Sequence, residues 1–270
     1  MVKIDLREAG MLGHLNLMQF HRESPLWSEG GVVQEEPGIL LYASASTFPV
    51  IFNGVFRTDD HVDPDVVLEH ANDHFANLKR GFSLWIREER DEDLAQAAGR
   101  FGFAELLRQP EMVCTQRLSV QPLPDDVEIR RVTTEEDTVR FVEISASAYS
   151  VYGMPPEVVY QNFSSPSKML LPHVVAVIAY VQGKPAATAL TFVKDGVAGV
   201  YWVGTIGEYR RQGLARAVVS EITNAGFDLG ARVSTLQATV MGEPLYKNLG
   251  YETAFHHRLY VRSHVYNKPS

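Results

Sequence analysis

One six-residue stretch, residues 210–215, combines basic side chains with small ones between two regular segments. The apolar run at residues 197–203 before it is typical of a strand, and apolar residues at helical spacing from Leu214 to Leu229 predict a helix that ends at Gly230. A strand that turns directly into a helix leaves several backbone N–H groups unpaired at the positive end of the helix dipole. Such a turn is suited to binding an anion, and phosphate in particular.

The side chains of this stretch fit the same chemistry. Gly213 and Ala215 have little or no bulk, so a phosphate can approach the backbone closely. Arg210, Arg211 and Arg216 add charge-assisted donors. Taken alone, the stretch fits an ordinary basic helix start equally well.

A second motif follows at the expected distance. After the segment Leu236-Gln237-Ala238-Thr239 comes Leu245-Tyr246-Lys247-Asn248-Leu249-Gly250-Tyr251. The combination of Arg-x-x-Gly-x-Ala on a strand–helix turn with Leu-Tyr-x-x-Leu-Gly-Tyr, separated by one helix and one strand, resembles the GNAT superfamily of acyl-CoA-dependent N-acetyltransferases. The resemblance covers residues 127–262 through these motifs and residues 1–118 through the overall pattern only.

The resemblance implies an α/β (α+β) fold with a mixed central β-sheet flanked by helices. Alternation and helical periodicity in the second half agree with that plan. The helices expected there are 135–148, 155–163, 214–229 and 242–249, and the strands are 127–131, 174–181, 186–194, 197–203, 233–238, 251–256 and 258–262.

The first half repeats part of this order. We expect strands at 39–45, 48–56, 82–86 and 112–118, and helices at 64–78 and 91–101. No Arg-x-x-Gly-x-Gly/Ala loop occurs between Phe56 and Pro64. We therefore interpret residues 1–120 as a degenerate GNAT-like domain, 121–126 as a Pro- and Asp-rich linker, and 127–270 as the catalytic domain, so that the chain is a tandem. An unrelated α/β domain is the alternative for the first half.

The resemblance also assigns roles to single residues. The backbone amide of Val203 is expected to stabilise the developing oxyanion, and the backbone of Val203, Gly204 and Thr205 to bind the pantetheine arm. Tyr246 is expected to protonate the departing thiolate, since its hydroxyl is neutral at pH 7; a core tyrosine is the alternative. The cofactor site is completed by the pyrophosphate loop, namely Arg210, Arg211, Gln212, Gly213, Leu214, Ala215 and Arg216, and by Thr239.

The general base is left open. Many relatives carry a glutamate on the strand before the loop, whereas residues 198–202 contain no acid. The base could be a water-mediated group, Glu243, His256 or His257, and the sequence does not choose among them.

Composition narrows the class of protein. The chain has 270 residues, 45% of them hydrophobic, without an apolar run long enough to span a bilayer and without a secretory signal at its start. A single cysteine, Cys114, excludes an internal disulfide and fits the cytoplasm. Residues 1–126 carry 21 acidic and 11 basic side chains, against 12 and 14 in residues 127–270, which argues against nucleic-acid binding. We expect no membrane partner.

Two further features have plain explanations. His70 and His74 share a helical face at a spacing that can bind zinc, but no third ligand is evident, and we expect a packed pair and no metal. Asn53-Gly54 is expected to be a turn or strand end, with a place beside an acceptor pocket as the alternative.

The expected function is transfer of an acetyl group from acetyl-CoA, as co-substrate, to an amine of a small molecule or peptide by direct attack. A non-catalytic acyl-CoA-binding sensor or interaction module is the alternative, motivated by the missing base. A longer acyl or an aminoacyl donor is a third option, and a homodimer is compatible with the pattern.

Overall fold

The strands of the two halves form one mixed sheet, in which the last strand of each half pairs with strands of the other half. The computed structural model describes residues 4–262. Among these, the sheet has 11 strands in the order β1-β2-β3-β4-β11-β5-β10-β9-β8-β7-β6. The strands are β1 Val32–Glu36, β2 Ile39–Ala43, β3 Asn53–Arg57, β4 Ser83–Arg87, β5 Phe103–Cys114, β6 Val127–Arg131, β7 Val174–Val181, β8 Lys184–Lys194, β9 Val197–Thr205, β10 Val233–Gln237 and β11 Glu252–Arg262. The helices are α1 Leu6–Glu23, α2 Pro64–Leu78, α3 Glu92–Arg100, α4 Glu135–Tyr149, α5 Pro156–Asn162, α6 Leu214–Asp228 and α7 Glu243–Leu249.

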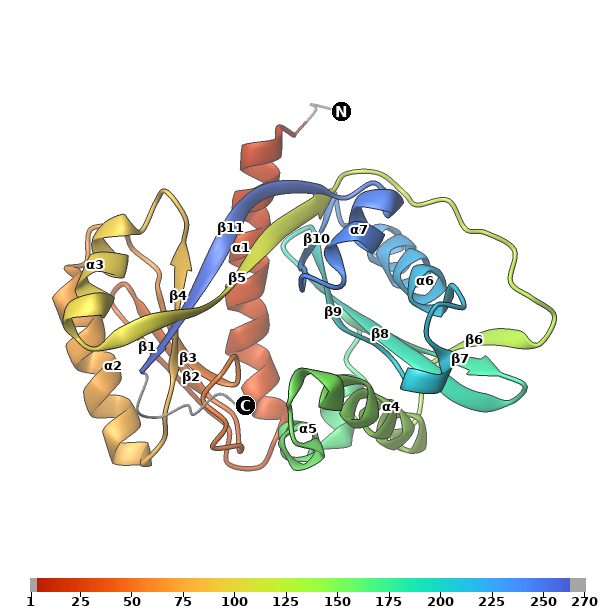
Figure 1. The fold of residues 1–270 in the computed structure, drawn as a ribbon, viewed down its shortest axis with the longest axis horizontal. Coiled ribbons are helices and arrows are strands. Elements are labelled where there is room, and N and C mark those ends of the chain that lie inside the picture. The colour runs from red at the N-terminus through yellow and green to blue at the C-terminus, as the bar shows by residue number, and fades with distance from the viewer. Residues whose placement is uncertain (1–3, 263–270) are drawn as a thin grey trace.

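The exchange involves the last strand of each half. β11 lies between β4 and β5, so the end of the chain pairs with two strands of the first half. β5 in turn pairs with β10, with Met112 opposite Leu236. Figure 1 shows these two long strands running from one half to the other. Each half therefore relies on a strand of the other for its backbone hydrogen bonds.

Helix α1 covers the junction of the halves, and the sequence did not lead us to expect it. Asp5 caps it by accepting a hydrogen bond from the Glu8 amide at 2.8 Å. Its second half packs Leu17 against buried residues of β2, β3 and β4, whereas Phe20 stacks on Tyr201 of β9 with ring centroids 3.9 Å apart. α1 thus contacts both halves along its length (Figure 1).

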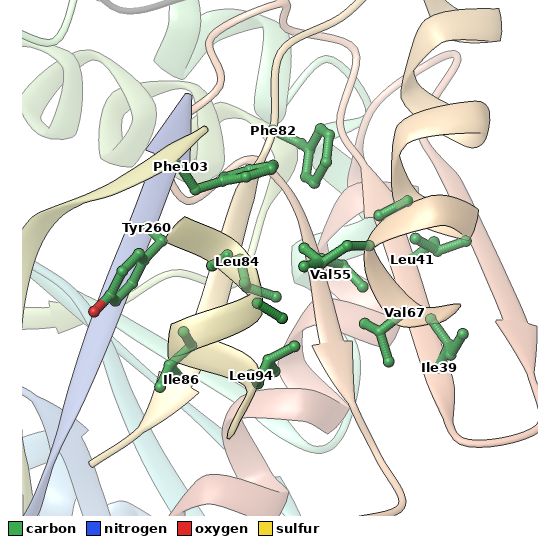
Figure 2. Close-up of a cluster of buried hydrophobic side chains, with 14 of the residues drawn as sticks. Ile39, Leu41, Val55, Val67, Phe82, Leu84, Ile86, Leu94, Phe103 and Tyr260 are labelled. Atoms are coloured by element: carbon green, nitrogen blue, oxygen red, sulfur yellow. The ribbon is translucent and has the colours of Figure 1, made fainter. Parts of the chain in front are cut away.

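The remaining helices cover the two faces of the sheet. In the first half, α2 and α3 bury one face, with Val67 and Leu94 packed on Val55 and Leu84 (Figure 2). In the second half, α6 packs on one face and α4 and α5 on the other, through alternating residues of β7 and β8. Because both faces are buried, β7 is wholly apolar and β8 carries charged residues only at its two ends.

The predicted fold class is confirmed: a mixed sheet flanked by helices, in the predicted order through residues 127–262. Four predicted strands differ from the structure. The strands expected at 251–256 and 258–262 are one strand, β11, with register shifts between Thr253 and Phe255 and between Leu259 and Tyr260. β5 begins at Phe103 rather than Met112 because it pairs with β11 along its whole length, and the strand expected at 48–56 is confined to β3.

The segment between the halves, residues 115–126, contains no helix or strand. It includes residues 121–126, and the linker at 121–126 and the boundaries 1–120 and 127–270 remain our proposal for the two repeats. Within residues 4–262, no helix has the length and apolarity needed to cross a membrane.

Candidate active site

The sheet opens at the point where β9 and β10 part. The two strands pair in parallel only from Val197 opposite Val233 to Gly199 opposite Thr235, although β9 continues to Thr205 and β10 to Gln237. On its other side β9 bulges, because Trp202 and Val203 stand opposite the single residue Ala189 of β8. A parted pair of strands beside a bulge leaves room for a chain-like ligand to lie along β9.

The bulge holds Trp202 in an unusual conformation, with φ of +54°. A bulky residue adopts this region only where its surroundings impose it, and such strain gathers at functional sites. Trp202 is fixed by Phe163 and Tyr149, with ring centroids 4.8 and 5.2 Å away. The Tyr149 hydroxyl also donates to the Val203 carbonyl oxygen at 3.3 Å, so the strand is held from α4.

A cavity of about 470 Å³ extends from this opening in both directions. Toward α6 its wall includes Val203, Gly204, Thr205 and most of the loop predicted to bind pyrophosphate. Toward the first half it reaches α1, β2 and β4. One cavity therefore joins the predicted cofactor residues to side chains from residues 17–109.

The loop before α6 is shaped as the sequence predicts. Gly213 is the N-cap of α6 with φ of +84° and no side chain caps the helix, so the first amide groups of α6 face the cavity without a side-chain acceptor. Arg211 precedes it with φ of +61°. Of the residues assigned to the cofactor from the sequence, Arg210, Arg211, Gly213, Leu214, Ala215, Arg216 and Thr239 line the cavity.

Two side chains that the sequence assigned to the cofactor form hydrogen bonds to the backbone instead. The Arg210 guanidinium donates to the carbonyl oxygens of Thr205 and Ala148, at 3.1 and 3.3 Å, so it ties the loop to β9 and α4. Gln212 donates to the Glu208 carbonyl oxygen at 3.2 Å, and its residue is not part of the cavity wall. Arg211 and Arg216 remain as the cationic side chains at the end of the cavity where the sequence predicts phosphate binding.

Tyr246 of α7 lies in the wall of the same cavity as Val203 and Gly204 of β9. Burial raises the pKa of its hydroxyl above the usual value, with a smaller contribution from Tyr152, so the group stays protonated at neutral pH. Within residues 4–262 the Tyr246 hydroxyl has no hydrogen-bond partner. Thr239, which accepts from the Gly242 amide at 3.1 Å, shapes the turn that leads into α7.

None of the three side chains considered as general base belongs to the described wall of the cavity. Glu243 pairs with Lys247 at 2.6 Å and His256 with Glu88 at 3.2 Å. His257 is fully buried and its Nε2 lies 2.9 Å from a carboxylate oxygen of Glu111. The structure therefore favours none of these three side chains as the general base.

The wall contributed by the first half was not assigned from the sequence. It includes His21 of α1, Tyr42 of β2 and Trp85 of β4. The His21 ring stacks on Tyr42 with centroids 4.3 Å apart. Burial lowers the pKa of His21 to about 3, so the imidazole is neutral. No sequence signal joined these residues, because they come from three separate elements.

None of the remaining sequence features belongs to the described wall of the cavity. His70 pairs with Glu36 and the Nδ1 of His74 lies 3.1 Å from the Gln34 amide oxygen, so both are tied to β1. Asn53 begins β3 and donates to the carbonyl oxygens of Ser46 and Phe48, which makes it a strand residue rather than a turn. Cys114 is buried in β5 and burial raises the pKa of its thiol, as expected for a packing residue.

Comparison with known proteins gives one family. Residues 139–251 match the acetyltransferase (GNAT) family. Compared by sequence with curated proteins, the chain matches none.

Several solved structures share its fold over both halves. A GCN5-related N-acetyltransferase from Kribbella flavida is 24% identical with a TM-score of 0.71, and the match covers 94% of this chain and 95% of that one. A tandem GNAT protein from the clavulanic acid biosynthesis pathway is 12% identical with a TM-score of 0.62, covering 94% and 87%. A GCN5-related N-acetyltransferase from Sphaerobacter thermophilus is 14% identical with a TM-score of 0.62, covering 83% and 76%.

Proposed function

We propose that this chain, a GNAT-family acyltransferase through its domain at residues 139–251, transfers an acetyl group from acetyl-CoA to an amine by direct attack. The observation that carries the proposal is the continuity of one cavity from the uncapped start of α6, through the opening between β9 and β10, to Tyr246. These are the three things that an acyl-CoA thioester needs: an anion site, an extended channel and a proton donor.

The residues present fit the CoA moiety. At the phosphate end, a Cβ built on Gly213 would meet nothing within 4 Å, so there is open space directly at the loop backbone. The first amides of α6 would hold the pyrophosphate, with Arg211 and Arg216 as flanking cations. The pantetheine arm would lie along β9 from Thr205 to Val203, where the parted strands leave the edge of β9 accessible.

Direct transfer would require only two catalytic groups from the chain, a hydrogen-bond donor for the oxyanion and a proton donor for the sulfur. The Val203 amide would donate to the carbonyl oxygen as negative charge develops there, and the bulge at Trp202 and Val203 supports this by turning the strand locally. As the C–S bond breaks, Tyr246 would give its proton to the sulfur. The first half supplies the wall against which the acceptor would rest, so positioning is its contribution.

Calorimetry with CoA tests the cofactor site. Gly213→Glu adds bulk and negative charge where the anion would meet the backbone, and we expect CoA affinity to fall below detection. Gly230→Glu is the matched control, because Gly230 lies at the other end of α6 with φ of +89° and is equally open, so it carries the same backbone strain. Equal CoA affinity in folded Gly213→Glu and Gly230→Glu proteins would refute the assignment.

A binding module without turnover is the alternative, and one observation favours it: Glu243, His256 and His257 all lie outside the described cavity wall. Release of free CoA thiol in the presence of an amine panel separates the two. Acceptor-dependent release supports the enzyme, and tight CoA binding with no release from any amine supports the sensor.

A further inference from the structure

Among the described residues, the acceptor side of the cavity lacks a carboxylate that would pair with a cation. Within the part of the chain that the structure describes, no Asp or Glu lines the cavity. Its formally charged side chains are Arg210, Arg211 and Arg216, all at the phosphate end. An aliphatic amine is an ammonium ion at pH 7, and burying that ion without a carboxylate costs several kcal/mol or more.

Aromatic rings form the acceptor side instead. Six of them come from five elements and both halves, namely Phe20, Tyr42, Trp85, Tyr149, Tyr201 and Trp202, and a seventh, Phe163, directly follows α5. The tyrosines among them are neutral, since burial raises the pKa of Tyr42, Tyr149 and Tyr201. Flat apolar faces of this kind favour a flat apolar ligand.

This aromatic region is long. Trp85 lies on β4, and β11 and β5 stand between β4 and β10. Three inter-strand spacings correspond to roughly 14 Å. The region therefore has room for a body much larger than an amino group.

The imidazole of His21 is a polar group in this wall. It is 5% exposed, and it has no hydrogen bond to any other residue within 4–262. Its ring stacks on Tyr42 and is tilted against Phe56 and Trp85, at 5.6 and 5.8 Å between centroids. A buried polar group without a protein partner, in the wall of a cavity, points to a hydrogen bond with a ligand.

We propose that the acceptor is an arylamine: an amino group attached directly to a flat aromatic body that bears a hydroxyl or amide group within reach of His21. The inference rests on the proposed acetyl transfer and names its substrate class. An arylamine is uncharged at pH 7 because its nitrogen lone pair is delocalised into the ring. It would therefore enter this wall without an ion to desolvate.

The same class accounts for the absent base. The neutral nitrogen attacks the thioester carbonyl carbon, the C–N bond forms, and the C–S bond breaks as the oxyanion collapses. The sulfur takes a proton from Tyr246, and Tyr246 recovers one from the nitrogen, which has become acidic after attack. The products are the N-acetylarylamine and CoA thiol, so no residue has to remove a proton before the reaction.

The first experiment compares matched acceptor pairs with the full chain and acetyl-CoA. A panel of hydroxylated one- and two-ring arylamines is set against the corresponding arylmethylamines, in which one CH₂ converts the arylamine into an alkylamine. Since an alkylamine of pKa about 10 is neutral in roughly one molecule per thousand at pH 7, we expect at least about 100-fold higher kcat/KM for the arylamines. Between pH 6.5 and 8.5 the arylamine rate should stay nearly flat.

The outcomes are distinct. Arylmethylamines that react as well as or better than arylamines would overturn the substrate class and leave acetyl transfer standing. Acetyl-CoA binding with no arylamine turnover would overturn it as well. If CoA binding is absent from the unaltered chain, the proposed function itself fails.

A second experiment tests His21. His21→Phe keeps a ring against Tyr42 and removes the polar atoms, so a hydroxylated arylamine should lose about tenfold in kcat/KM while its unsubstituted analogue is little affected. His74→Phe, on α2 and away from the cavity, is the control. Equal effects on both acceptors would show that His21 does not bind the acceptor.

Discussion

Glu111 of β5 and His257 of β11 form a hydrogen-bonded pair in which neither side chain is exposed. The His257 Nε2 lies 2.9 Å from a Glu111 oxygen that also accepts from the Gln237 amide at 2.8 Å. Thr235 donates to the other carboxylate oxygen. The carboxylate thus joins a strand of the first half to two strands of the second, at the place where the halves exchange neighbours.

This pair makes the junction sensitive to substitution. Glu111→Leu leaves the partners of the carboxylate buried without an acceptor, and we expect a loss of about 3–5 kcal/mol in the free energy of unfolding by urea denaturation. Glu105→Leu is the control, since Glu105 lies on the same strand and pairs with Arg258 at 2.7 Å near the surface. Its loss should be about 0–1 kcal/mol. Similar losses for both variants would show that the buried cluster adds no stability.

Acid should destabilise the protein through His14. Desolvation lowers the pKa of His14 well below its usual value, and electrostatic interactions with His257, Arg87 and Arg90 lower it further. Neither ring nitrogen of His14 has a partner within residues 4–262. Below pH of about 6.5 the unfolded chain therefore binds a proton that the folded chain does not, so stability is complete above that pH and falls as pH decreases.

The expected slope is about 1.4 kcal/mol per pH unit for one such group, between pH 6 and 4. His14→Phe should remove that contribution, so that the free energy of unfolding falls less steeply with acid than in the unaltered chain. The exposed His61→Phe serves as the control. An unchanged slope in His14→Phe would mean that His14 does not titrate in this way.

Tyr246→Phe tests the proton donor. Because the hydroxyl acts only when the thiolate leaves, kcat should fall by about 10²–10⁴-fold while the affinity for acetyl-CoA stays nearly the same. The ring and its packing against Tyr251, 6.0 Å between centroids, are retained, so stability should change by about 1 kcal/mol or less. Tyr152→Phe, in the same cavity wall, controls for loss of a hydroxyl. Normal kcat in Tyr246→Phe would identify Tyr246 as a packing residue.

The local structure of the loop that we propose for the cofactor could be predicted from the sequence. The strand, turn and helix around Gly213 are contiguous in the chain. The geometry of the turn depends on local backbone preferences, because a φ of +84° at its last residue favours glycine and because no side chain caps the helix that follows. The sequence likewise placed Tyr246 on a short helix after the next strand, where the structure has it. Local interactions decide such features, so local patterns predict them.

The part of the cavity that we propose for the acceptor is formed only by the tertiary structure. His21, Tyr42 and Trp85 come together only because α1 crosses the sheet between the halves and because β11 leaves its own half to pair with β4. Strand pairing between residues 150 positions apart, such as Arg258 with Arg108, has no signature in either segment. The sequence of each segment predicts a strand but not its partner. The pairing of each strand depends on how much apolar surface the whole sheet buries.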